Sequence, residues 1–89
     1  MEHKIFDKLN ELVEDSIDLI EHGVTNGKKS DFLNIDDGIR TSQGVIDFIK
    51  VDSSGCYVNL NGDIAELRKL KKETIIQIGC YFEGSVSGK

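Results

Sequence analysis

The sequence predicts an α+β fold in which an amphipathic N-terminal helix packs on a small antiparallel β-domain of five strands. Two observations predict it: apolar residues recur with helical spacing over residues 2–22, and short β-branched and aromatic runs separated by turn residues fill residues 32–83. With 89 residues and no internal repeat, the chain is expected to form a single domain, residues 1–89, with a thin core.

The predicted helix has one wide apolar face. Its central row has the 4-3-4-3 spacing of an amphipathic helix and consists of Ile5, Leu9, Leu12, Ser16 and Leu19, with Phe6, Val13, Ile17 and Ile20 beside it. A basic residue in the last turn and a glycine just after it are typical of a helix end, and His22 and Gly23 match this pattern. The helix is therefore expected to end at residue 22. Residues 23–31 then form a linker.

Turn residues divide the β-domain. Residues 32–35 form a short strand, Asp37-Gly38 a hairpin turn, and residues 39–51 a long strand bent at Gly44. Asp52-Ser53-Ser54-Gly55 is a tight turn before an alternating strand at residues 56–61. After Asn61-Gly62, a strand at residues 64–67 is favoured over a short helix. Residues 74–83 form the last strand and residues 84–89 a flexible tail.

Composition predicts the compartment of the protein and the state of its two cysteines. No stretch of 18 apolar residues occurs and the N-terminus is charged, so we expect a cytoplasmic protein without a membrane segment. Cys56 and Cys80 each lie in an apolar, strand-like run, which predicts buried free thiols.

The charge is unevenly distributed. The net charge is −5, which makes nucleic acid an unexpected partner because binding to phosphates requires positive surface. Residues 1–66 contain 6 basic and 14 acidic side chains, whereas residues 67–89 contain 5 basic and 2 acidic ones.

Five carboxylates fall within about 80° of one another on the helix, opposite its apolar face. This acidic stripe consists of Asp7, Glu11, Glu14, Asp18 and Glu21. It extends over about 21 Å, and Lys4 and Lys8 lie to its side, so most like charges have no basic residue between them. The stripe is interpreted as the binding surface for a larger protein with a basic surface, the alternative being an ordinary solvated helix face.

The apolar row of the helix has two interpretations. Its spacing suits packing on the β-domain, and it is equally that of a coiled-coil seam, which would form a homo-oligomer through Ile5, Leu9, Leu12 and Leu19.

A second candidate contact set, for a small ligand or nucleic acid, combines an aromatic ring with a basic cluster. It consists of Tyr57, Arg68, Lys69, Lys71 and Lys72. The alternative is a solubilising loop beside a tyrosine that completes a sheet face.

No motif in the sequence predicts catalysis, a metal or a cofactor. His3 and His22 have no Cys, His or carboxylate at metal-ligand spacing, and no nucleophile-base pair or phosphate-binding glycine run occurs. We therefore expect a protein that is not an enzyme.

The order of elements resembles the Sm-like or SH3-like small barrel. The stretch FLNIDDGIRTSQGVIDFIKVDSSGCYVNL resembles the first Sm motif, and the likeness covers residues 32–80. It implies a curled five-stranded barrel, and in Sm proteins an RNA-binding function, but no site residues are transferred. Within this fold class, GDIAELRKLKKETI is similar to the end of a small acidic family that inhibits the transcription terminator Rho by protein contact. Asp52-Ser53-Ser54-Gly55 resembles the turn of PilZ cyclic-di-GMP domains.

Together these features predict a small acidic adaptor or inhibitor of bacterial or phage type that docks on a larger protein. A nucleotide- or RNA-binding barrel and a structural homo-oligomer are the alternatives.

Overall fold

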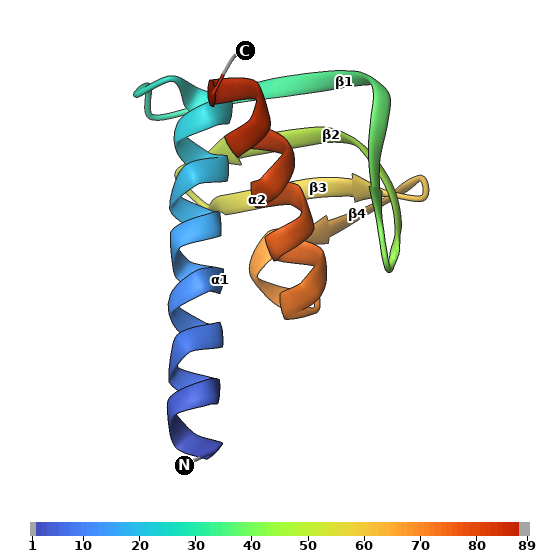
Figure 1. Ribbon diagram of the computed structural model, residues 1–89. Helices are drawn as coiled ribbons and strands as arrows, with labels where there is room; N and C mark the ends of the chain where they lie inside the picture. The colour runs from blue at the N-terminus through green and yellow to red at the C-terminus, as the bar shows by residue number, and fades with distance from the viewer. Residues whose placement is uncertain (1, 88–89) are drawn as a thin grey trace.

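The chain folds into two layers, a pair of helices on one face of an antiparallel sheet (Figure 1). The computed structural model describes residues 2–87. The element order is α1 (Glu2–Thr25), β1 (Asp31–Thr41), β2 (Gly44–Asp52), β3 (Gly55–Leu60), β4 (Asp63–Glu66), η1, a 3₁₀ helix (Leu67–Lys69), and α2 (Lys72–Ser87). The four strands form an open meander in the order β1-β2-β3-β4. The α+β prediction with an N-terminal helix is confirmed; the fifth strand and the closed barrel are not found among residues 2–87.

The first helix is longer than predicted. It continues through Gly23 to Thr25, and Asn26, with φ 52°, adopts the left-handed conformation that ends it. The Asn26 N–H donates to the carbonyl oxygen of His22 over 2.7 Å. Gly23 instead faces the ring of Phe82 on α2, where a Cβ atom would lie 2.6 Å from Cδ1. Gly23 therefore permits close packing of the two helices, and the connection to β1 is shorter than the predicted linker.

The first hairpin turns at a different place than predicted. Thr41 pairs with Gly44, so Ser42 and Gln43 form the turn, and the Thr41 hydroxyl donates to the Gly44 carbonyl oxygen over 2.7 Å. Asp37 and Gly38 lie within β1, where the register shifts between Asn34 and Ile39. Gly38 has φ 75°. Glycine adopts this conformation without steric cost, so it suits the irregularity in the strand. The predicted turn at Asp37-Gly38 is therefore an irregularity within a strand, and the predicted bend at Gly44 is the end of the hairpin turn.

The turns that flank β3 are confirmed. Asp52 accepts hydrogen bonds from the backbone N–H and the hydroxyl of Ser54, at 2.8 and 2.6 Å. Asn61 and Gly62, both with positive φ, connect Leu60 to its partner Asp63. The segment after that turn combines the two interpretations weighed for it, because a strand ends at Glu66 and the 3₁₀ helix follows at once.

The predicted last strand is wrong: residues 72–87 form α2. Ile75, Ile78 and Phe82 recur at spacings of 3 and 4 and are buried against α1 and the sheet. The consecutive β-branched residues in this segment favour a strand locally, but burial of one helical face outweighs that preference. Residues 84–87 of the predicted tail are part of α2, and residues 88–89 lie outside the described residues.

One hydrophobic core joins the two layers. α1 contributes Val13, Ile17, Ile20 and Val24, and the sheet contributes Ile35, Ile39, Ile46, Ile49, Cys56 and Val58. The opposite face of the sheet is open, and Phe32 and Lys50 on it are exposed.

Candidate functional site

The N-terminal half of α1 extends past the sheet and forms an overhang (Figure 1). Burial on this helix begins at Val13, whereas Ile5 is 69%, Phe6 60% and Leu12 48% exposed. Of the two interpretations of the apolar row, packing on the β-domain does not hold for Ile5 and Leu12, because the helix is longer than the sheet that it covers.

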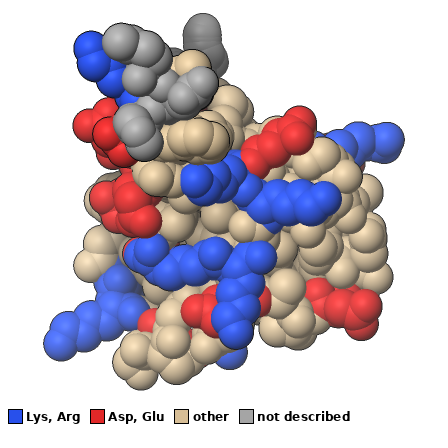
Figure 2. All heavy atoms as spheres, turned by 90° about the horizontal axis from the view of Figure 1, so that it is seen from below, with Lys and Arg blue, Asp and Glu red and all other residues tan. Residues whose placement is uncertain are grey.

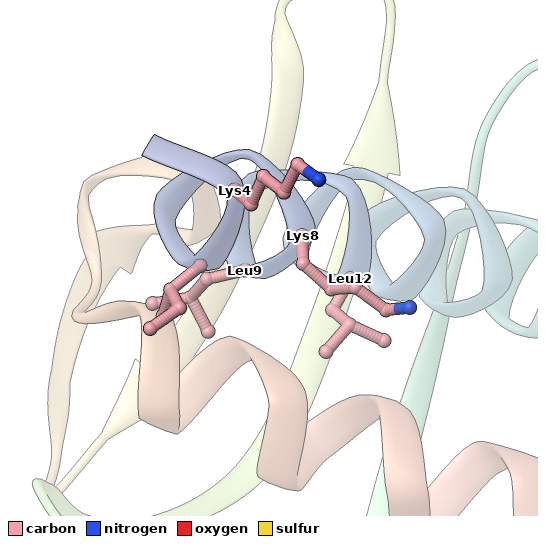
Figure 3. Close-up of a pocket in the computed structure, with 5 residues that line it drawn as sticks. Lys4, Lys8, Leu9 and Leu12 are labelled. Carbon is pink, nitrogen blue, oxygen red and sulfur yellow. The ribbon is translucent and has the colours of Figure 1, made fainter. Parts of the chain in front are cut away.

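An open hollow of about 420 Å³ lies along this overhang. Leu9 and Leu12 leave α1 on the side that faces α2, and Lys4 and Lys8 border them (Figure 3). Ile5 completes the lining. The hollow has an apolar floor with basic side chains on its rim.

A second hollow of about 240 Å³ continues from the first, between α1 and α2. Leu12, Ser16 and Leu19 line it from α1, and Ile76 and Cys80 from α2. Asp15 stands on its rim, so its border is acidic where that of the overhang is basic. The groove was not predicted, because Ile76 and Cys80 were expected on a strand, although the 3-4 spacing of Ile75, Ile78 and Phe82 is typical of a helix.

The acidic stripe lies on the opposite flank of α1. Asp7, Glu11, Glu14 and Asp18 are exposed, and Glu21 is half-buried. Glu14 forms an ion pair with Arg68 of η1, with 3.4 Å between Oε1 and Nη1, and both side chains are more than half exposed. The predicted stripe is thus displayed on the surface, with one of its carboxylates paired within the chain.

The basic cluster lies where η1 meets the start of α2. Besides the Arg68 pair, the Lys69 ammonium lies 3.9 Å from Glu66, and the Lys72 ammonium donates to Oδ1 of Asn10 on α1. The Lys71 side chain is exposed. Figure 2, which views this end of the molecule, shows basic groups across its middle and acidic groups toward its edges. Two of the four predicted basic side chains therefore contact the first helix.

Tyr57 lies on the open face of the sheet. Its hydroxyl is 3.1 Å from the hydroxyl of Ser54, and the Lys50 ammonium lies 5.6 Å from the ring centroid. Tyr57 thus contacts two neighbours on the sheet, whereas Arg68 and Lys72 contact α1. These members of the predicted ligand-contact set therefore lie on two different surfaces.

The two cysteines have different surroundings. Cys56 is 3% exposed, and burial, with a smaller contribution from Glu21, raises the pKa of its thiol to about 12. Cys80 is exposed on α2, so the prediction that it is buried is wrong, while the prediction for Cys56 is confirmed. Both thiols are free.

Within residues 2–87, no group of three or more His, Cys, Asp or Glu side chains is arranged to hold a metal ion. No helix in that same range is both long and apolar enough to cross a membrane. Comparison of the chain with protein-family models, with curated proteins and with solved structures finds no match.

Proposed function

We propose that this chain is a non-enzymatic binding domain that docks on a basic surface of a larger protein, with α1 as its contact element. The observation that carries the proposal is the overhang of α1, which holds Phe6 60% exposed beside the acidic stripe. Phe6, Asn10 and Glu14 recur every four residues, so Phe6 lies beside the stripe in the row that leads to Glu14.

This pairing of groups suits a protein partner. A large aromatic side chain on a helix provides affinity when it enters a pocket of the partner and loses its contact with water. A row of carboxylates next to it increases the association rate with a basic surface and sets the orientation of docking. Phe6 would therefore provide most of the affinity, and Asp7, Glu11 and Asp18 would steer the encounter.

The contacts of the basic cluster also favour a protein partner over nucleic acid. Arg68 and Lys72 already contact Glu14 and Asn10 of the same molecule, so a phosphate would compete with these groups. The net charge of −5 adds long-range repulsion.

The experiment compares two variants that change the net charge by the same amount. E11K/D18K alters the stripe, and D36K/D63K alters exposed carboxylates on the sheet. Glu14 is retained because of its pair with Arg68. The immobilised protein is presented to host lysate at low and high salt, and captured proteins are quantified by mass spectrometry.

We expect a partner whose capture at low salt decreases at least about tenfold in E11K/D18K and in F6S but not in D36K/D63K. Circular dichroism of each variant checks that the helices are intact. Equal capture by all four proteins would refute the proposal, as would equal loss in the two charge variants, because the effect would then be one of net charge alone.

A further inference from the structure

The overhang and the groove form one continuous apolar strip. Ile5, Leu9 and Leu12 line the overhang, Leu12, Ser16 and Leu19 line the groove, and Leu12 belongs to both. The strip is about 21 Å long, since it spans 14 residues of helix. Ile5 and Leu12 on it are 69% and 48% exposed, which is unusual for large aliphatic side chains in one row.

We propose that a second copy of this chain covers the strip, with the two α1 helices antiparallel about a twofold axis at Leu12. Ile5 lies seven residues before Leu12 and Leu19 seven after, so this arrangement places Ile5 of each copy on Leu19 of the other. The same axis puts Leu9 at the level of residue 15 of the second copy, so Leu9 packs beside the neighbouring Ser16, a large side chain next to a small one. The overhang of each molecule fills the groove of its partner, where Ile76 and Cys80 add apolar contact from α2.

The charges on the two rims select the second copy as the occupant. Lys8 borders the overhang and Asp15 borders the groove. In a heptad that has Leu12 at position d, Lys8 and Asp15 both occupy position g, next to the seam. In an antiparallel pair of helices, the g positions of the two copies face each other. The twofold axis brings Lys8 of each copy to within one residue of the level of Asp15 in the other, which allows two symmetric Lys8–Asp15 contacts between the copies.

A parallel pair lacks this complementarity. It would direct Lys8 and Asp15 toward positions 13 and 20 of the other copy, and Val13 and Ile20 are buried in the core of their own molecule. The rim charges together with the burial of Val13 and Ile20 therefore favour the antiparallel orientation of the two copies.

The dimer does not depend on the proposed function. The acidic stripe lies on the opposite flank of α1 and stays on the outside of the pair, which would then present two copies of it. Loss of dimerisation and loss of partner capture are thus separable, because different side chains carry them.

The test is sedimentation equilibrium of the full chain over a wide range of concentration. We expect the mass to rise from 9.9 kDa toward twice that value as concentration increases. L12D should remain monomeric, and it should fold because Leu12 is 48% exposed. The control F32D carries the same kind of change on an aromatic side chain that is 58% exposed on the open sheet face, and it should dimerise like the unmodified chain.

Charge exchange tests the orientation. K8D and D15K should each weaken the dimer at least about tenfold, and K8D/D15K should restore its dissociation constant to within a few-fold of the original. Alkylation of Cys80 provides a second measurement, since dimerisation should slow it in the unmodified chain but not in L12D. A monomer at every concentration, a dimer that survives L12D, or no recovery in K8D/D15K would each overturn the inference.

Discussion

Ser16 on α1 and Gly79 on α2 face each other so closely that a Cβ atom added at Gly79 would lie 2.7 Å from both Cβ and Oγ of Ser16. The two helices therefore approach with almost no side chain between them at this point. The approach brings Ile75, Ile78 and Phe82 of α2 into the core and leaves Ile76 and Cys80 at the rim of the groove.

We predict that Gly79→Ala destabilises the protein although alanine is the better helix former. Alanine would contribute about 1 kcal/mol through helix propensity, but overpacking costs about 1–3 kcal/mol, so the free energy of unfolding should decrease by about 1 kcal/mol. Urea denaturation at one fixed protein concentration measures the change.

Gly84→Ala is the matched control on the same helix. A Cβ added there meets nothing within 4 Å apart from its own stretch of helix, so this variant should gain about 0.5–1 kcal/mol. Adding Ser16→Gly to Gly79→Ala should recover part of the loss, because it removes the atoms that clash. A stabilised Gly79→Ala would contradict the close approach of the helices.

Gln43, in the first hairpin turn, caps the second helix. Its Oε1 accepts a hydrogen bond of 2.8 Å from the backbone N–H of Lys71, immediately before α2. Gln43→Ala should lower the free energy of unfolding by about 1 kcal/mol, as loss of a helix cap does. Thermal and urea denaturation measure this loss.

Gln43→Glu separates the cap from the turn. It retains an oxygen acceptor and adds a negative charge at the N-terminal end of the helix, so its stability should equal or exceed that of the unmodified chain. If Gln43→Ala and Gln43→Glu lose the same stability, the turn and not the cap is responsible.

The two thiols should react at very different rates. Iodoacetamide at pH 8 should modify exposed Cys80 and leave Cys56 unmodified until the protein unfolds, because burial raises the pKa of the Cys56 thiol to about 12. Mass spectrometry of peptides from native and urea-unfolded protein identifies the modified residue. Rapid modification of Cys56 in the native protein would contradict its burial.

The raised pKa also predicts an effect on alkaline stability. The Cys56 thiol ionises with a pKa of about 12 in the folded chain and near its ordinary value of 9.0 in the unfolded chain. Its stabilising contribution is therefore complete below pH 9 and is lost as pH rises toward 12. The unmodified chain should lose more stability over this interval than Cys56→Val, and equal losses would contradict the shift.

Local chemistry made parts of the fold predictable. Three elements could be predicted because the pattern that identifies each one lies within its own residues. They are the helix with its spacing from Ile5 to Ile20, the Asp52–Gly55 turn, and the alternating strand that follows this turn. The last segment does not, because its consecutive Ile75 and Ile76 favour a strand while the spacing of its buried residues favours a helix. The exposure of Ile5 and Phe6 could not be read from the sequence either, since the pattern identifies an apolar face without indicating how far the sheet beneath it extends.

The sequence by itself determined that α1 is a helix with acids on one flank and apolar side chains on the other, because 3.6 residues per turn place them there irrespective of the rest of the chain. Only the tertiary structure decided which part of the apolar face is buried. The sheet covers α1 from Val13 onward and α2 approaches it at Gly79, whereas Ile5 and Leu12 stay exposed because the sheet does not extend beneath the first turns of the helix.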